Sequence, residues 1–456
     1  MVECDPAKDR VTANYLKTTS RATWQLKNGI SLKKWLYYIS VFLIAFFPED
    51  IEKLTIVKIG GIQLYGIDFI YLLVLVALSS AIVHRKAIQL PVEGKVYVAM
   101  LAWIAVAVVN GFFQYGHRAF GESRYVLPFF AFFVPFALID DSGNTQVKQV
   151  VEIVSKTIII AAAAGFILFC IELINGGRFF VTAVNRAELS GFEDFRGVRY
   201  LGSTHTFNIL ALASMLIIRF STHKRIKLLE ILSVIALFIA ALVSRNRAAL
   251  FATLAGLVVL LISRGRIKLL LVSLVSIVAG FYTVQLVEPS MTENISTAIL
   301  SGLNPAEDPT GQWRLVRNLS AFDQAMITPW FGQGLGGYLD FEDPSHNQFL
   351  FLFLKTGLPG TILCIVTIVL FLRRYLIVRK DLARDRNQDL IGSVLALIIV
   401  SQLAYGMAYG FIPFYGVYYG FGLLLFRSVN ARARRFRLQA KHSENGPRAN
   451  GTEQIS

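Results

Sequence analysis

The chain has 456 residues, of which 55% are hydrophobic and only 16% are charged, whereas a soluble domain carries roughly 25% charged residues. This composition excludes soluble enzyme folds. The formal net charge of +15 would favour nucleic-acid binding in a soluble protein, but in a membrane protein such an excess reports how loops are sorted across the bilayer.

Apolar stretches long enough to cross a bilayer recur along the whole chain. They predict an all-α polytopic membrane protein with about 12 transmembrane helices. Because this number is even, both termini lie on the same side. The predicted spans are 32–48, 66–83, 96–113, 125–139, 157–174, 206–218, 228–243, 247–262, 268–287, 358–372, 390–408 and 411–426.

Basic residues decide the orientation of these spans. They precede the first span, follow the last, and occupy alternate loops, as at Arg85-Lys86, Lys224-Arg225 and Arg373-Arg374. The positive-inside rule assigns these loops and both termini to the cytoplasm. The outer face then holds two long connections, about 175–205 and about 288–357, and function is expected there rather than on a nucleic-acid surface.

The second outer connection contains a predicted helix and a turn. The helix runs from about Thr310 to Ile327, because Pro329 follows and stops it. The glycine-rich segment 330–338 then predicts a turn in which the backbone can approach a neighbour. This segment partly matches G-x-G-x-x-G, but no predicted strand precedes it, so dinucleotide binding is disfavoured.

The end of this connection predicts a broken helix. From His346 to Arg373 a single helix would be about 40 Å long, more than the roughly 30 Å hydrocarbon core. Gly357-Leu358-Pro359-Gly360 is a natural break. We therefore expect a short interfacial helix over 346–356 that leads into the tenth span.

His346 is the candidate for proton transfer, because it lies at the outer membrane surface. A neutral imidazole there can accept a proton from a sugar hydroxyl. The alternative is that Ser345, His346 and Asn347 only cap a helix. No Asp-x-Asp, HExxH or zinc-type Cys/His spacing occurs in the sequence, so neither a metal nor another cofactor is indicated.

Four outer arginines are candidates for binding pyrophosphate. Arg245 and Arg247 occupy a short hairpin at the lipid interface, and Arg314 and Arg317 share one face of the helix over 310–327. A guanidinium matches pyrophosphate oxygens without a metal ion. The alternative for any single arginine is snorkelling to the lipid headgroups.

Four fragments together resemble the O-antigen ligase and polymerase family of bacterial envelope glycosyltransferases over about residues 200–372. They are Ser244-Arg245-Asn246-Arg247-Ala248-Ala249, Trp313-Arg314, Pro329-Trp330-Phe331-Gly332-Gln333-Gly334, and His346-Asn347 followed by Leu350 and Gly357-x-x-Gly360.

This resemblance implies a GT-C type fold in the bacterial inner membrane with a periplasmic active site. It also implies a donor glycan on undecaprenyl pyrophosphate. Ligases of the family pass the glycan to the lipid A core, and polymerases pass it to another lipid-linked repeat unit. By position, His346 matches the catalytic histidine, and Arg247 and Arg314 match the family's arginines. Arg245 and Arg317 become further phosphate contacts, with Asn347 and Gly334 in supporting roles.

Several alternatives stay open at this point. Ligase and polymerase use the same donor and differ only in the acceptor. A polysaccharide or lipid transporter is disfavoured, because charged residues are few inside the spans, and a scaffolding membrane protein is a further alternative. The expected organisation is a basic segment over 1–31, spans over 32–199, the catalytic region over 200–372 with its periplasmic loop 288–357, spans over 373–427, and a basic, partly disordered tail over 428–456.

Overall fold

The structure of the chain is a computed structural model. It describes residues 55–59, 62–65, 90–116, 119, 122, 126–139, 143–175, 203–222, 227–243, 247–263, scattered positions between 271 and 286, 309–336, 347–407 and 415–444. The predicted spans 32–48 and 66–83, and most of the predicted span 268–287, lie outside these residues.

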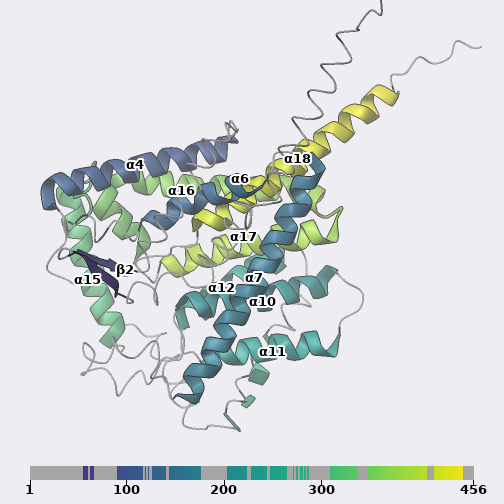
Figure 1. Ribbon diagram of the computed structural model, residues 1–456, viewed down its shortest axis with the longest axis horizontal. Helices are drawn as coiled ribbons and strands as arrows, with labels where there is room; N and C mark the ends of the chain where they lie inside the picture. The colour runs from purple at the N-terminus through teal and green to yellow at the C-terminus, as the bar shows by residue number, and fades with distance from the viewer. Residues whose placement is uncertain are drawn as a thin grey trace, which may run out of the picture.

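Long helices dominate the described part of the chain (Figure 1). Their bounds are α4 Val92–Tyr115, α7 Gly143–Ile174, α10 Ser203–Thr222, α11 Leu228–Val243, α12 Arg247–Ser263, α15 Pro309–Ile327, α16 Gln348–Leu382, α17 Arg386–Gly406 and α18 Tyr415–Glu444. α18 therefore continues well beyond residue 427, where the sequence predicted the end of the last span.

Four helices are long and apolar enough to cross a membrane, namely Val92–Tyr115, Gln146–Ile174, Gln348–Leu382 and Arg386–Gly406. Three shorter apolar helices, His205–Phe220, Leu228–Val243 and Ala248–Ile262, coincide with further predicted spans. The protein is thus a helical membrane protein. The total of about twelve spans stays a prediction.

The predicted helical fold is confirmed, with one addition and one error. The addition is an antiparallel hairpin of β1 (Thr55–Ile59) and β2 (Ile62–Tyr65), which the sequence analysis did not predict. Their β-branched residues flank Gly60-Gly61, which is a pattern typical of a hairpin. The error concerns the predicted span 125–139, which is not one α-helix. It consists of the 3₁₀ helix η1 (Leu127–Phe132) and the short helix α6 (Phe133–Leu138), each of which contains a proline.

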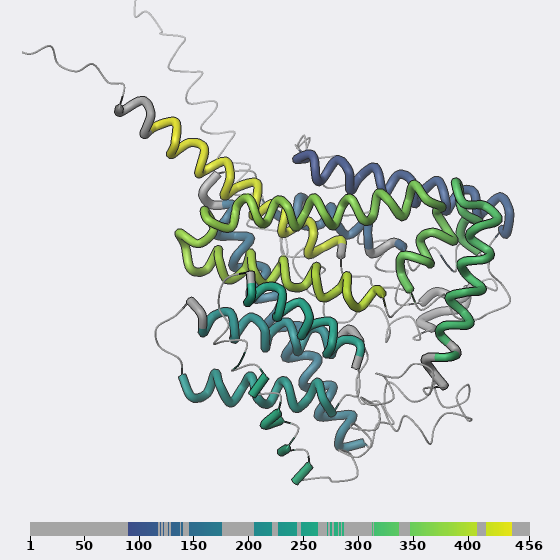
Figure 2. The backbone as a smooth tube through the Cα atoms, turned by 180° about the vertical axis from the view of Figure 1, so that it is seen from behind, coloured from purple at the N-terminus to yellow at the C-terminus, as the bar shows by residue number. Residues whose placement is uncertain are grey.

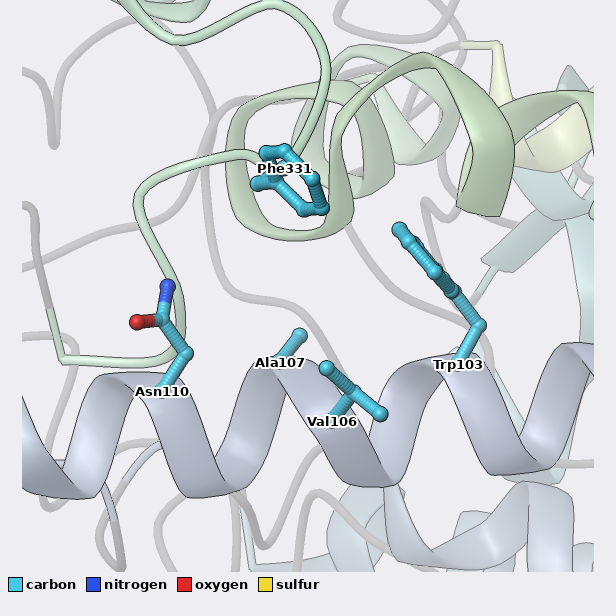
Figure 3. Close-up of a pocket in the computed structure, with 5 residues that line it drawn as sticks. All are labelled: Trp103, Val106, Ala107, Asn110 and Phe331. Carbon is cyan, nitrogen blue, oxygen red and sulfur yellow. The ribbon is translucent and has the colours of Figure 1, made fainter.

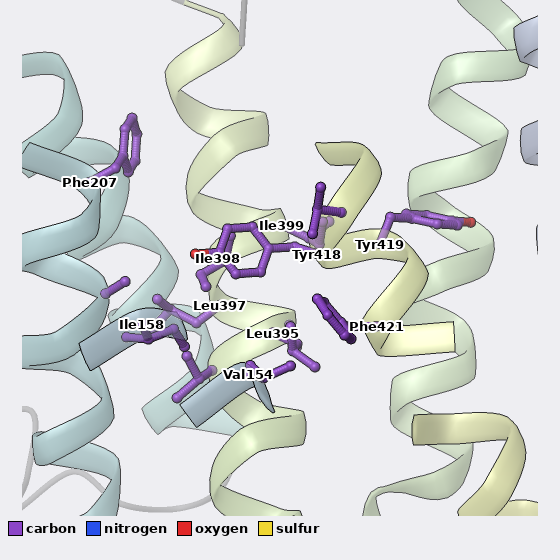
Figure 4. Packing of buried hydrophobic residues seen from close by; sticks show 14 of the residues in the cluster. Val154, Ile158, Phe207, Leu395, Leu397, Ile398, Ile399, Tyr418, Tyr419 and Phe421 are labelled. Carbon is purple, nitrogen blue, oxygen red and sulfur yellow. The ribbon is translucent and has the colours of Figure 1, made fainter. Parts of the chain in front are cut away.

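α17 lies at the centre of the bundle. Its residues from Gln388 to Ile399 are all buried, so neighbours surround it on every side. Figure 4 shows Leu395 and Leu397 of α17 among Val154 of α7 and Phe421 of α18. Close packing against several helices fixes this helix in place.

α16 changes direction at Gly357, whose φ of 69° and ψ of −172° are not helical. This observation confirms the predicted break. In both views α15 runs across the direction of α4, α17 and the part of α16 that follows the break, at one end of these helices (Figures 1 and 2). The segment of α16 from Gln348 to Thr356, called here the first segment of α16, packs beside α15.

Candidate functional site

Asn347 fixes the amino end of the first segment of α16. Its Oδ1 accepts hydrogen bonds from the backbone N–H groups of Phe349 at 3.0 Å and Leu350 at 3.1 Å, which is an N-cap. Its Nδ2 donates to the carbonyl of Met407 at 3.4 Å, where α17 ends. The capping role that we weighed for 345–347 is confirmed for Asn347. His346 precedes Asn347 in the sequence and lies outside the described residues.

α15 packs on the first segment of α16 through small residues. Ala321 and Ala325 of α15 are buried together with Leu354 of α16. The rings of Phe322 and Phe353 lie 6.4 Å apart between centroids. The last two turns of α15 therefore lie beside the last turns of the first segment of α16.

The turn after α15 joins both helices to the same point. The N–H of Leu358 donates to the carbonyl of Pro329 at 2.8 Å, and the N–H of Gln333 donates to the carbonyl of Leu354 at 2.8 Å. The N–H of Gly334 donates to the carbonyl of Lys355 at 3.1 Å. Backbone contacts therefore hold the carboxyl end of α15 against the carboxyl end of the first segment of α16.

Glycines make this close approach possible. Gly332, Gly334 and Gly336 have φ values of 68°, 75° and 90°, which favour glycine. A Cβ on Gly334 would lie 2.6 Å from the backbone nitrogen of Gly111 in α4. The predicted turn with a close backbone neighbour is confirmed, and Gly334 is part of it.

The shared end sets the register of the predicted site residues. α15 and the first segment of α16 lie side by side and end at the same turn, so they run in the same direction. Arg317 precedes Ile327 by as many residues as Asn347 precedes Gly357, and each lies about 15 Å from the shared end. Arg317 is therefore level with Asn347.

Arg314 lies one turn beyond Arg317 on the same face of α15. This face is the one on which Ala321 and Ala325 are buried, and both arginines are half-buried. The structure thus places Arg314, Arg317 and Asn347 at one end of this helix pair.

An ion pair that sequence reasoning missed supports the turn. Lys355 is only 1% exposed, and its Nζ lies 2.6 Å from Oε1 of Glu122. Oε2 of Glu122 accepts a hydrogen bond from the N–H of Gly336. The sequence showed Lys355 only as a charge near a span end, and nothing near Glu122 pointed to a partner so distant in the chain.

A hollow of about 190 Å³ lies between Phe331 of the turn and the side chains of α4, and no sequence pattern predicted it. Figure 3 shows Trp103, Val106, Ala107 and Asn110 on α4 with Phe331 opposite them. The indole Nε1 of Trp103 donates to the carbonyl of Thr356 at 2.7 Å, so this ring is fixed against α16. The hollow offers aromatic faces and one amide to a ligand.

Of the other two candidate arginines, the structure describes only the backbone of Arg247. Arg247 is the first residue of α12, which confirms that this fragment opens a helix. The side chain of Arg247, and all of Arg245, lie outside the described residues. α12 packs on α17, where a Cβ on Gly256 would lie 2.5 Å from Oγ of Ser401. Among the described residues, no three His, Cys, Asp or Glu side chains gather as metal ligands would.

Comparison with known proteins agrees with the resemblance drawn from the sequence. A search among curated proteins finds no match. Residues 232–365 match the family model described as O-antigen ligase. This region contains α12, α15, the glycine turn and the first segment of α16, and with them all the predicted site residues. This match supports the resemblance of residues 232–365 to the O-antigen ligase and polymerase family of membrane proteins.

Proposed function

We propose that this protein transfers a glycan from undecaprenyl pyrophosphate to an acceptor hydroxyl at the periplasmic face of the bacterial inner membrane, as an O-antigen ligase does. The observation that carries the proposal is the register of α15 and the first segment of α16. It brings Arg317 level with Asn347, the neighbour of His346 in the chain, and Arg314 one turn beyond. A base beside paired guanidinium groups suits glycosyl transfer from a pyrophosphate.

In the proposed reaction His346 removes the proton from the acceptor hydroxyl. The acceptor oxygen attacks the anomeric carbon from the side opposite the pyrophosphate, and a new glycosidic bond forms. The bond between that carbon and the pyrophosphate oxygen breaks, so the configuration inverts and undecaprenyl pyrophosphate leaves. Arg314 and Arg317 stabilise the negative charge that grows on the leaving group.

Arg247 belongs to the same proposed site, with Arg245 as a second phosphate contact. Gly256 packs against Ser401, and α17 ends near Met407, which accepts from Asn347. The predicted topology makes α12 and α17 antiparallel. That orientation brings the first residue of α12 to the end of α17, and therefore towards Asn347.

One reconstitution experiment tests the proposal. The purified full chain in lipid nanodiscs is incubated with a synthetic undecaprenyl-pyrophosphate-linked repeat unit, with and without lipid A core, in the presence of EDTA. A ligase forms glycosylated lipid A core only when the core is supplied. A polymerase, the second function within this family, extends the lipid-linked glycan without it. If both substrates remain unchanged in protein that still binds the donor, the proposal is overturned.

A further inference from the structure

α15 is an amphipathic helix whose apolar face is turned away from the rest of the protein. A surface helix normally turns its apolar stripe towards the protein. On α15 the side chains turned towards α16 include the half-buried Arg314 and Arg317, and the apolar stripe is turned outwards. The exposed fractions along that stripe are 59% for Leu315, 56% for Leu319, 46% for Phe322 and 54% for Met326.

The spacing of the stripe shows that it is one continuous face. Successive members are four, three and four residues apart, so they lie above one another on a helix with 3.6 residues per turn. Asp323, the only acidic residue of α15, lies at the edge of this face. A stripe of this length in contact with water would be an unusual exposed apolar patch.

The stripe continues into other exposed apolar residues. Ile327 ends α15, and Trp330 and Phe331 follow it in the turn; all three are exposed. Phe331 faces Val106 of α4 across the hollow (Figure 3). α4 is one of the helices that can cross a membrane, and its exposed apolar side chains form a surface suited to lipid.

The direction of α15 agrees with a position at the membrane surface. α15 crosses the direction of α4, α17 and the later part of α16 at one end (Figures 1 and 2). A helix that crosses the ends of membrane-spanning helices lies in the plane of the membrane. Aromatic residues such as Trp330 are enriched at that depth.

We propose that the outward face of α15, continued by Trp330 and Phe331, docks into the hydrocarbon of the outer leaflet, so that α15 is an in-plane membrane helix. Bilayer lipid is the occupant because the stripe is continuous with the exposed apolar surface of α4. An amphipathic helix in this position buries its apolar face at the boundary of headgroups and acyl chains. The inference does not depend on glycosyl transfer.

Spin labels can test this docking in the full chain. Single cysteines at Leu319 and Phe322 are introduced after Cys4, Cys170 and Cys364 are replaced by alanine, and each protein is labelled in nanodiscs. The matched controls are Leu438 of α18, which is 59% exposed and lies beyond the last predicted span, and Ile167 of α7, which is 59% exposed within a candidate span. Collision rates with oxygen and with a water-soluble nickel complex report the surroundings of each label.

Labels at residues 319 and 322 are expected to collide preferentially with oxygen, as the label at 167 does. The label at 438 is expected to collide preferentially with the nickel complex. Collision with the nickel complex at 319 and 322 at the rate seen at 438 means that water covers the stripe and overturns the proposal. Low rates with both reagents mean that a second copy or another protein covers the stripe, which also overturns it.

Discussion

Asn347 shows how one side chain can join two helices beside the proposed site. Its Oδ1 closes the first turn of α16, and its Nδ2 reaches the carbonyl of Met407 at the end of α17. These contacts fix the backbone beside His346. The alternatives of capping and catalysis that the sequence left open are therefore compatible, because they fall on neighbouring residues.

Replacement of His346 by alanine is expected to lower the rate of glycan transfer by about 10²- to 10⁴-fold, the usual contribution of a general base. Donor binding should persist, since the pyrophosphate contacts are elsewhere. The measurement is the single-turnover rate with lipid-linked donor, beside membrane yield. His223→Ala, in a predicted cytoplasmic loop, is the matched control and should keep the full rate. A normal rate in the His346 variant would rule out its role.

Arg314→Ala and Arg317→Ala are expected to weaken donor binding and to lower turnover, each by about 10²- to 10³-fold in kcat if the group stabilises the leaving pyrophosphate. Arg384→Ala is the control, because its exposed guanidinium pairs with Asp381 at 3.5 Å near the opposite end of α16. Binding of undecaprenyl pyrophosphate and kcat are measured separately. Unchanged values of both in the two variants would contradict the proposed site.

Loss of the buried ion pair should destabilise the protein. Lys355→Met leaves the Glu122 carboxylate uncompensated, which costs about 3 to 5 kcal/mol for a buried pair. Glu122→Gln together with Lys355→Met should recover part of that loss. The exposed pair Lys156 and Glu152, with a 2.5 Å contact, is the control, and Lys156→Met should cost at most about 1 kcal/mol. The stability of each variant is measured by thermal unfolding in detergent. Equal losses of stability for Lys355→Met and Lys156→Met would contradict the prediction that the buried ion pair matters more than the exposed one.

At the scale of elements, the glycine turn controls the register between α15 and α16. It is held by backbone contacts to Leu354, Lys355 and α4, so its shape depends on the main chain rather than on side chains. Substitutions in the turn should therefore shift α15 relative to α16, and this shift would move Arg314 and Arg317 relative to Asn347.

Gly334→Ala is expected to lower the melting temperature and the transfer rate together, because its Cβ would meet the backbone of Gly111 and its φ is 75°. Gly116→Ala is the control. Gly116 has a φ of 61°, but a Cβ there would meet nothing within 4 Å, so this change costs backbone strain alone, about 1 to 3 kcal/mol. Melting temperature is measured by fluorescence scanning. If the two variants melt alike, the close approach to α4 does not matter.

Elements with a local signal were predictable. The helix over 310–327, the turn after it and the break at Gly357 were all predicted, because proline and glycine mark chain ends and kinks directly. The hairpin over 55–65 was missed because each of its strands is much shorter than an apolar stretch that could cross a membrane. The span over 125–139 was wrong because Pro128 and Pro135 interrupt an otherwise apolar stretch.

At the scale of the whole molecule, features that depend on distant pairing could not be read from the sequence. The pairing of Glu122 with Lys355 and the hollow between Trp103 and Phe331 each join segments far apart in the chain. The type of a residue alone does not identify a partner that is distant in the chain. Candidate site residues could be proposed where short fragments resembled a family, but their relative positions required the packing of α15 on α16.

The common anchor of the two helices at the glycine turn also makes helix length a functional quantity. Arg317 and Asn347 are level because their helices contain equal numbers of residues between them and the anchor. One residue inserted between Ala321 and Ile327 would rotate Arg317 by about 100° and shift it by about 1.5 Å relative to Asn347. The same insertion before Arg314 would leave both arginines in place. Tolerance to insertion should therefore change abruptly within a single helix, on either side of its two arginines.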